Sequence, residues 1–402
     1  MNSPILFGYL LRGALRALAK PLATALAALA LLTVSVAADD LKTTAPMAYM
    51  LAPESGTLLF AKEQDTKFSP GSLVKVMTAA TVFKALADGT ATDDKLCTVS
   101  EHAWRTGGAP SRTATMFAAL KSEIPISDLL RGLLVHNAND AAIILAECLS
   151  GTEADFAKQM NAYAGEIGMA NSLFINPTGF VQDDQQNQNH TTVRDMVLLA
   201  REILSEHADR YSLFTEPEFT WNNIYQRNRN PLLGEIRDMD GLGAGQDDKD
   251  GYSALVSVER DGRRVIAAIA GAPSANARIA AVREVIEGAW TFYTVKKLYA
   301  KGDTVADARI HDGTVSTVEL VPAEDVDVLL PRGETLDYRL RVVYSGPLIA
   351  PVASGMKVGE LLVLGKDGIV HRTPLVTNAE VGRGDMQARA LDGLRELLFG
   401  WF

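Results

Sequence analysis

Residues 69–78 read Ser-Pro-Gly-Ser-Leu-Val-Lys-Val-Met-Thr, and they put Ser72 three residues before Lys75. Apolar residues recur without a helix breaker from Val74 to Phe83, which predicts a helix. Residues i and i+3 share one helix face, so we expect the lysine amine to reach the serine hydroxyl and remove its proton. A weak nucleophile beside a base is what a nucleophilic serine requires. Such a spacing arises about once by chance in a chain of ordinary composition, so its partners elsewhere in the chain decide its meaning.

The composition is that of a globular protein, with 402 residues, 47% of them hydrophobic and 22% charged. This length predicts two domains, with room for appendages. A formal net charge of -10 argues against a nucleic-acid partner, because a phosphate-binding surface should be basic. No pair of the six histidines has the spacing of a zinc protease helix, and two cysteines make no zinc cluster. We therefore expect no metal and no cofactor.

The first 38 residues have the pattern of a signal peptide. Three basic residues, the last of them Lys20, precede an uncharged run over residues 21–38 that ends in small residues. A basic segment, an apolar segment and a small-residue exit are typical of export signals. The alternative is an uncleaved membrane anchor, but the run is slightly short for a span of about 20 residues. Export with cleavage is the favoured interpretation.

Export would bring the two cysteines, Cys97 and Cys148, into an oxidising compartment. They can pair there, although their spacing does not show it. The simpler interpretation of Cys148, which lies in an apolar helical stretch, is a buried thiol.

The last residues, 385–402, predict an amphipathic helix. Apolar residues recur there at helical spacing and end in Trp401 and Phe402, with charged residues between them. Such a helix can lie in a membrane interface. The alternative is docking onto the protein's own surface, and Gly393 and Gly400 weaken the helix; the membrane interpretation is only slightly favoured.

Between these ends the pattern predicts an α+β domain over residues 39–296. Short apolar runs at 47–51 and 56–61 predict a hairpin, and the runs at 254–258 and 265–269 flank Asp261-Gly262, a strong hairpin signal. Helical patterns lie between them, including a long one at 127–149 that is interrupted at 136–140. Strands at both ends with helices between predict one sheet that joins distant segments. Residues 297–384 carry short β-rich runs separated by turn residues, which predicts a small all-β domain.

Two later elements accompany the Ser72–Lys75 pair: Asn137-Ala138-Asn139, and the run Asp-Gly-Leu-Gly-Ala-Gly at 240–245. In this order the three resemble the signatures S-x-x-K, S-D-N and K-T-G of the penicillin-recognising serine enzymes. The chain as a whole resembles their exported, low-molecular-weight D-alanyl-D-alanine carboxypeptidases, with a β-lactamase/transpeptidase-like catalytic domain, a β-rich second domain and an amphipathic C-terminal anchor. Stretches that carry this resemblance include residues 69–78, 139–142, 176–179, 192–196 and 228–233.

The resemblance implies a role for each matched residue. Ser72 would be the acyl-enzyme nucleophile and Lys75 its general base, with Asn137 at the position of the second motif's catalytic serine. Asn139 would hydrogen-bond the substrate amide. The backbone N–H groups of Ser72 and of the strand near Gln246 would form the oxyanion hole. The substrate would be the D-Ala-D-Ala end of a peptidoglycan stem peptide, β-lactams would bind at the same site, and the protein would lie at the outer face of the bacterial cytoplasmic membrane.

Two departures from the family pattern weaken the expected activity. Asn137 replaces a serine that relays a proton, and loss of such a transfer costs about 10²–10⁴-fold. Gly243 and Ala244 replace the lysine and threonine that recognise the substrate carboxylate, which leaves Gly245 and, in place of a usual histidine, Gln246. Each lost charge-assisted hydrogen bond costs about 1.5–3 kcal/mol. Arg229, by its match to the family, remains as a candidate carboxylate ligand.

Three hypotheses follow. The first is an attenuated D,D-carboxypeptidase, because Ser72, Lys75 and Asn139 are intact. The second is a non-catalytic homologue that binds peptidoglycan or partners at the membrane surface, because the second and third motifs are altered. The third, a β-lactamase, shares the nucleophile but not the second domain and the anchor. The glycine run at 241–245 lacks the spacing and the following helix of a nucleotide loop. The first hypothesis is slightly favoured over the second.

Overall fold

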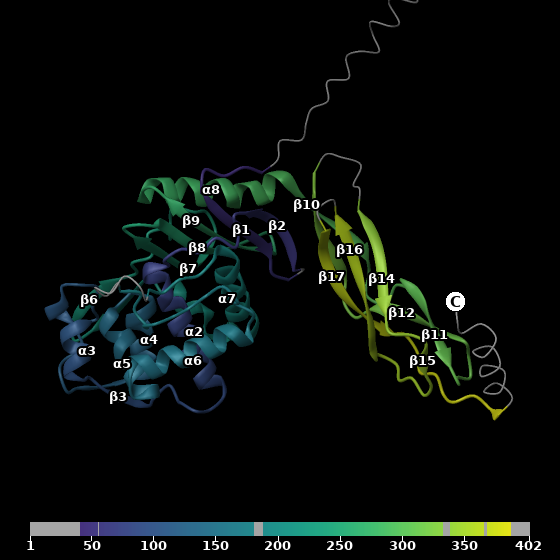
Figure 1. The fold of residues 1–402 in the computed structure, drawn as a ribbon, viewed down its shortest axis with the longest axis horizontal. Helices are drawn as coiled ribbons and strands as arrows, with labels where there is room; N and C mark the ends of the chain where they lie inside the picture. Colours follow the sequence, from purple (N-terminus) through teal and green to yellow (C-terminus); the bar gives the residue numbers. More distant parts are fainter. Residues whose placement is uncertain (1–40, 55, 181–187, 333–337, 366–367, 387–402) are drawn as a thin grey trace, which may run out of the picture. The chain divides into compact units, whose positions relative to one another are not determined.

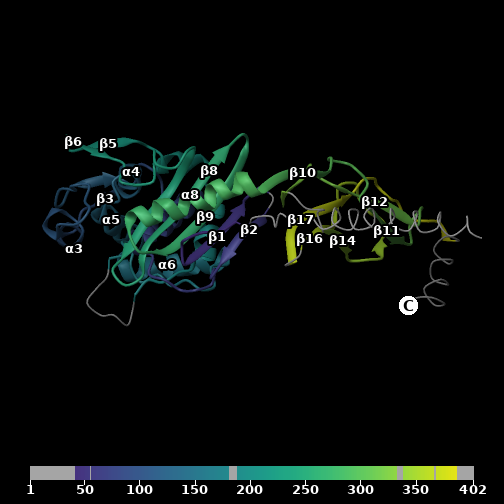
Figure 2. The ribbon, with the colours of Figure 1, turned by 90° about the horizontal axis from the view of Figure 1, so that it is seen from above.

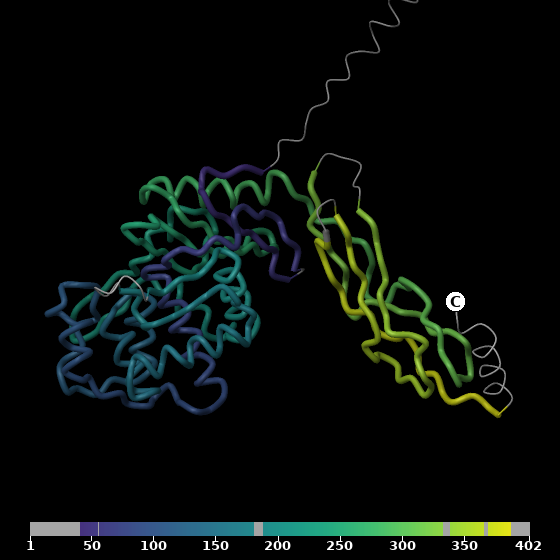
Figure 3. The backbone as a smooth tube through the Cα atoms, in the orientation of Figure 1, coloured from purple at the N-terminus to yellow at the C-terminus, as the bar shows by residue number. Residues whose placement is uncertain are grey.

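The computed structural model describes residues 41–54, 56–180, 188–332, 338–365 and 368–386. Its central element is an antiparallel sheet of five strands in the order β2-β1-β9-β8-β7. The first and last parts of this region therefore meet, and Figure 3 shows the purple N-terminal strands beside the green late ones. Tyr49 lies opposite Ala268 in this pairing. The strands are β1 (Met47–Ala52), β2 (Thr57–Lys62), β7 (Met239–Asp247), β8 (Gly251–Arg260) and β9 (Arg263–Ala272).

Both faces of this sheet are covered by helices. Since side chains point to alternate faces along a strand, neighbouring residues of one strand belong to different cores. Met50 and Ile269 pack with α8 (Ala275–Phe292) on one face, while Tyr49 and Leu51 belong to the core formed with the other helices. Figures 1 and 2 show α8 lying along the sheet, with α2, α4, α5, α6 and α7 on the opposite side. These helices are α2 (Val74–Ala87), α4 (Ile126–Leu134), α5 (Asn139–Ser150), α6 (Glu153–Glu166) and α7 (Val193–Glu206).

Smaller elements complete this region. Helix α7 begins where the side chain of Thr192 accepts a hydrogen bond from the Asp195 amide, a helix cap that satisfies an otherwise unpaired donor. The interruption that the sequence predicts at 136–140 corresponds to a break at residues 135–138, which separates α4 from α5. The remaining elements are η1 (Gly71–Leu73), β3 (Leu96–Thr98), α3 (Glu101–Thr106), η2 (Ala109–Ser111), β4 (Glu123–Pro125), η3 (Ala208–Phe214), β5 (Glu218–Trp221) and β6 (Ile224–Arg227).

The part of the chain after α8 is made of strands, as expected. One sheet has the order β14-β16-β17-β12-β11-β15, and β10 pairs with β13 in a second. Their buried side chains, among them Leu320, Val363 and Leu375, form a cluster of their own. The predicted α+β fold with a later all-β part is thus confirmed. The strands are β10 (Tyr293–Tyr299), β11 (Ala306–His311), β12 (Thr317–Pro322), β13 (Val326–Pro331), β14 (Arg339–Tyr344), β15 (Leu348–Ile349), β16 (Lys357–Gly365) and β17 (Gly368–Thr377).

The two cysteines form a disulfide, so the simpler interpretation of Cys148 as a buried thiol is wrong. Cys97 in β3 and Cys148 near the end of α5 have Cα atoms 5.4 Å apart, within the range that a disulfide spans. The two residues are 51 positions apart in the chain. Their meeting depends on the packing of α5 beside β3, which spacing does not reveal.

The signal-peptide segment, residues 1–38, and residues 387–402 of the expected amphipathic helix lie outside the described residues. Among the helices that the structure describes, none is long and apolar enough to cross a membrane.

Candidate active site

Ser72 and Lys75 lie at the junction of η1 and α2. Ser72 is in the 3-10 turn Gly71–Leu73, and α2 begins two residues later at Val74. The predicted helix is therefore preceded by a tighter turn that carries the nucleophile candidate. Ser72 is half-buried, whereas Lys75 is 3% exposed. Val74, Val76 and Met77 are buried too, so this end of α2 is fixed on all sides.

Lys75 is a buried amine without a carboxylate partner among the described residues. Its Nζ donates a hydrogen bond of 2.9 Å to the carbonyl oxygen of Thr178. Burial lowers the pKa of this amine to about 7, because removal from water disfavours the charged form. A lysine with a pKa near neutrality is suited to act as a general base at physiological pH.

The Thr178 carbonyl is held by a network inside the loop that contains it. The side-chain oxygen of Asn176 accepts hydrogen bonds from the backbone of Thr178 and Gly179, at 3.2 and 2.8 Å, and from the side chain of Asn189. All of these groups are buried or half-buried. The sequence drew attention to residues 176–179 only through the family resemblance. In the structure they hold in place the carbonyl oxygen that accepts the hydrogen bond from Lys75.

The second motif lies between α4 and α5. Asn137 has a φ of 56°, in the left-handed region where asparagine is tolerated better than most residues. Asn139 begins α5, and its side-chain nitrogen donates to the Thr113 hydroxyl at 3.0 Å. The next residue, Asp140, is fully buried and accepts hydrogen bonds from Thr115, Met116 and Ala118. The start of α5 is thereby fixed to the loop over residues 113–118.

The third motif lies on β7, which is the edge strand of the sheet beside η1. Gly243 and Ala244 are half-buried, Gly245 is buried and Gln246 is exposed. A side chain at Gly245 would overlap the carbonyl oxygen of Pro70, and one at Gly179 would overlap that of Gly71. Glycine is required at both positions because the backbone carbonyls of the two residues just before Ser72 leave no space for a Cβ atom.

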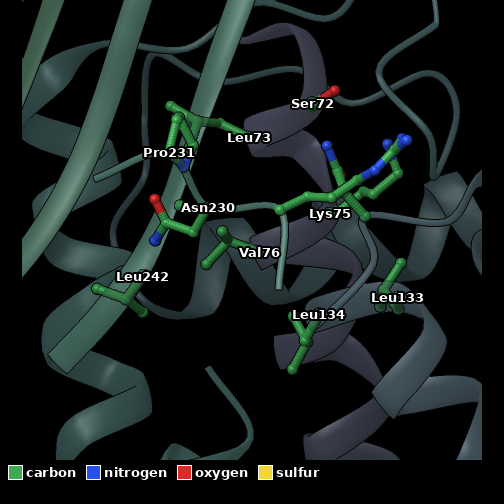
Figure 4. Close-up of a pocket in the computed structure, with 13 residues that line it drawn as sticks. Ser72, Leu73, Lys75, Val76, Leu133, Leu134, Asn230, Pro231 and Leu242 are labelled. Atoms are coloured by element: carbon green, nitrogen blue, oxygen red, sulfur yellow. The ribbon is translucent and has the colours of Figure 1, made fainter. Parts of the chain in front are cut away.

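One pocket brings most of the predicted residues together. Ser72, Lys75, Asn137 and Arg229 line it together with Gly243 and Ala244. Figure 4 shows Ser72 and Lys75 on the helical segment at this pocket, with Leu133 and Leu134 from a second helix and Leu242 on the neighbouring strand. Arg229 is held there by its backbone N–H, which donates to Val135 at 2.8 Å. Asn139, Gly245 and Gln246 do not line the pocket: Asn139 contacts Thr113, while Gly245 and Gln246 lie against Pro70 and Gly71 just before Ser72.

Arg278 is a residue near this site that sequence reasoning missed. It lies on α8, is 5% exposed, and donates from its guanidinium to the Gly245 carbonyl at 3.3 Å. Burial lowers its pKa, and no carboxylate among the described residues lies within ion-pair distance of it. The sequence gives no sign that an arginine in this helix lies near the site, because its proximity to β7 depends on the way α8 crosses the sheet.

The described residues hold no cluster of histidine, cysteine or carboxylate side chains suited to a metal ion. The pocket itself offers Ser72, Lys75, the backbone segments around them and the guanidinium of Arg229.

Comparison with known proteins identifies the family of this arrangement. Residues 33–274 match the family described as D-alanyl-D-alanine carboxypeptidase, and residues 293–383 match the C-terminal domain of penicillin-binding protein 5. The chain belongs to the D-alanyl-D-alanine carboxypeptidase family. Members of this family are low-molecular-weight penicillin-binding proteins, and the resemblance seen in the motifs is thereby confirmed.

Relatives of the carboxypeptidase family match over most of their length. The D-alanyl-D-alanine carboxypeptidase DacD of Escherichia coli is 30% identical over 341 residues, which cover 84% of this chain and 87% of DacD. DacA of Haemophilus influenzae is 29% identical over 385 residues, or 93% and 96% of the two chains. The crystal structure of penicillin-binding protein 5 from Haemophilus influenzae superposes with a TM-score of 0.73 at 27% identity, covering 85% of this chain and 98% of that one.

Proposed function

We propose that this protein is a serine-type D-Ala-D-Ala carboxypeptidase that acts on peptidoglycan stem peptides through an acyl-enzyme, with attenuated activity. The observation that carries the proposal is the buried Lys75 amine, with its pKa lowered to about 7, in one pocket with Ser72. The membership of the chain in the carboxypeptidase family supports the choice of substrate.

The reaction has two steps. Neutral Lys75 accepts the Ser72 proton while the serine oxygen attacks the carbonyl carbon of the penultimate D-alanine. The peptide C–N bond then breaks, and the leaving amine takes a proton as D-alanine departs. Water next attacks the serine ester and restores Ser72. The backbone N–H of Ser72 and one N–H of β7 near Gln246 are the candidate donors to the oxyanion in both steps.

Attenuation follows from the two altered motifs. Asn137 does not exchange protons near neutral pH, so the proton transfer to the leaving amine falls to Lys75 or water. Gly243 and Ala244 offer no side-chain donor to the substrate carboxylate. Arg229, on the pocket wall, is the best placed remaining cation for that carboxylate, and the buried Arg278 beside Gly245 is a second candidate.

A second candidate function is a non-catalytic homologue that binds peptidoglycan or partners at the membrane surface. The pocket favours it through the same two changes, since Asn137 and Gly243 both face the cavity that contains Ser72. The two candidates differ in whether Ser72 can be acylated.

Labelling with a fluorescent penicillin tests this difference. We expect the full-length protein to form a covalent adduct that survives denaturation, and Ser72→Ala to form none. Ser205→Ala is a matched control, because Ser205 is exposed at the end of α7 and its loss should leave labelling unchanged. Absence of labelling in the unmodified protein at any penicillin concentration would support the non-catalytic candidate.

We also propose that the protein is exported to the bacterial periplasm and lies at the outer face of the cytoplasmic membrane. The basic and apolar pattern of residues 1–38 supports export. The amphipathic pattern of residues 385–402 supports attachment to the membrane surface.

A further inference from the structure

The turn between β7 and β8 is joined to the segment before Ser72 by one hydrogen bond. The backbone N–H of Ser69 donates to the Asp250 carboxylate at 2.7 Å, although the two residues are 181 positions apart. Both residues are half-buried, and a carboxylate acceptor makes such a bond stronger than one between neutral groups. Among the described residues, no other hydrogen bond joins residues 69–73 to residues 243–251.

The position of Asp250 is itself fixed. The side-chain oxygen of Asp247 accepts a hydrogen bond of 3.0 Å from the backbone N–H of Asp250. Gly251 follows with a φ of 76°, and a Cβ atom there would overlap the carbonyl oxygen of Ala272 on β9. The turn is thereby held by Asp247 from within and by β9 from outside, and it presents the Asp250 carboxylate to Ser69 from a fixed support.

The two segments that this bond joins carry the two candidate donors to the oxyanion. Ser72 lies three residues after Ser69 on one segment. On the other segment, Gln246 lies four residues before Asp250. The backbones are in direct contact, because a Cβ atom at Gly71 would lie 2.2 Å from the carbonyl oxygen of Gln246. Such contact prevents closer approach, but dispersion between a few atoms resists separation only weakly. The hydrogen bond to Asp250 supplies that resistance.

The distance between the two donors matters for the reaction. Both must lie about 3 Å from one oxygen atom as its negative charge develops, and a displacement of about 1 Å can reduce the rate about 100-fold. We propose that Asp250 is a positioning residue, which holds the backbone N–H of Ser72 and the donor near Gln246 at the distance that the oxyanion requires. The inference rests on the proposed carboxypeptidase function, whose covalent steps it leaves unchanged.

Two measurements on the full-length protein test this inference. In the reaction with a fluorescent penicillin, Asp250→Ala should lower the limiting rate of acylation by about 10- to 100-fold. The dissociation constant of the noncovalent complex should stay unchanged, because the two donors act in the transition state. Phenylboronic acid, which has no carboxylate, binds a nucleophilic serine as a tetrahedral adduct that resembles the oxyanion. Its affinity should fall by a similar factor in Asp250→Ala, and circular dichroism checks that each variant is folded.

Three further variants separate the hydrogen bond from the fold and from the charge. Asp250→Asn keeps an oxygen that can accept the Ser69 N–H, so it should restore acylation to near the unmodified rate. Asp250→Ser, whose oxygen stops one bond short of the carboxylate oxygen, should behave like Asp250→Ala and replaces it if the alanine variant does not fold. Asp248→Ala is the matched control, because Asp248 is exposed in the same turn, and it should leave both measurements unchanged.

The outcomes separate this inference from the proposed function. If penicillin labels the unmodified protein and folded Asp250→Ala at the same limiting rate, the positioning role is wrong and the carboxypeptidase proposal stands. An unchanged affinity of Asp250→Ala for phenylboronic acid, or slow acylation of Asp250→Asn, also overturns the positioning role alone. If the unmodified protein is not labelled at all, both proposals fail.

Discussion

At the scale of single residues, the nucleophile candidate and its base have different surroundings. Ser72 is half-buried in a tight turn, while Lys75 is almost completely buried and donates to a backbone carbonyl. A carbonyl is a neutral acceptor, so it holds the amine without restoring the charge that burial disfavours. The position of Thr178 therefore allows the base to be fixed and neutral at the same time.

This arrangement predicts a pH dependence of acylation. The neutral amine is the base, and it is the dominant form above its pKa of about 7. The rate of penicillin acylation should therefore rise as pH increases from about 5.5 to 7, roughly tenfold per unit at the lower end, and level off above about 8. The measurement is the second-order rate constant of fluorescent penicillin labelling across this range, with circular dichroism at each pH as the control for folding. A rate that falls with increasing pH would exclude Lys75 as the base.

At the scale of elements, α5 connects the second motif to the rest of the domain. Its N-terminus carries Asn139 and the buried Asp140, whose carboxylate accepts three hydrogen bonds from the loop over residues 115–118. Its C-terminal end is joined to β3 through Cys148 and Cys97. The helix is thus fixed at both ends, and Asn139 is positioned by contacts at a distance from the pocket.

The disulfide should contribute strongly to stability. A cross-link that closes a loop of 51 residues removes conformational entropy from the unfolded chain. By the loop-entropy relation, this raises the free energy of the unfolded state by about 4 kcal/mol. We expect Cys97→Ser with Cys148→Ser to lower the free energy of unfolding by about 2–4 kcal/mol, measured by urea unfolding followed through tryptophan fluorescence. Dithiothreitol should lower the unfolding midpoint of the unmodified protein to that of the variant and leave the variant unchanged. If the oxidised protein and the variant had the same urea unfolding midpoint, the disulfide would not contribute to stability as predicted.

At the scale of the whole molecule, the sequence predicts individual helices, hairpins and their junctions better than the contacts between distant elements. The Asp261-Gly262 signal predicts the β8–β9 hairpin, and the interruption at 136–140 predicts the α4–α5 junction, because both depend on local residue preferences. Strand β10 (Tyr293–Tyr299) crosses the predicted domain boundary between residues 296 and 297. The contact of Lys75 with Thr178, 103 positions apart, and the approach of Arg278 to Gly245 follow from tertiary packing. Neither has a signature in the sequence.

The ends of the chain lead to a prediction about the membrane. If residues 385–402 form an interfacial helix, the full-length protein should float with vesicles that contain anionic phospholipid, and a chain ending at residue 384 should not. Leu58→Ser is a control, since Leu58 is an exposed leucine elsewhere on the surface, and it should float like the unmodified protein. Flotation of the shortened chain with the vesicles would assign membrane binding to another surface.

The glycines around Ser72 also bear on how this protein can change over time. At Gly179 and Gly245 any side chain would overlap a backbone carbonyl, so almost every substitution there should be lost to selection for folding. Gly243 lies two residues before Gly245 on the same strand, and a Cβ atom there would make only ordinary van der Waals contacts, at 3.4 Å with Leu73 and 3.6 Å with Val76. Mutational tolerance therefore differs sharply along β7. A small side chain can replace Gly243 while the backbone that supports the nucleophile remains unchanged.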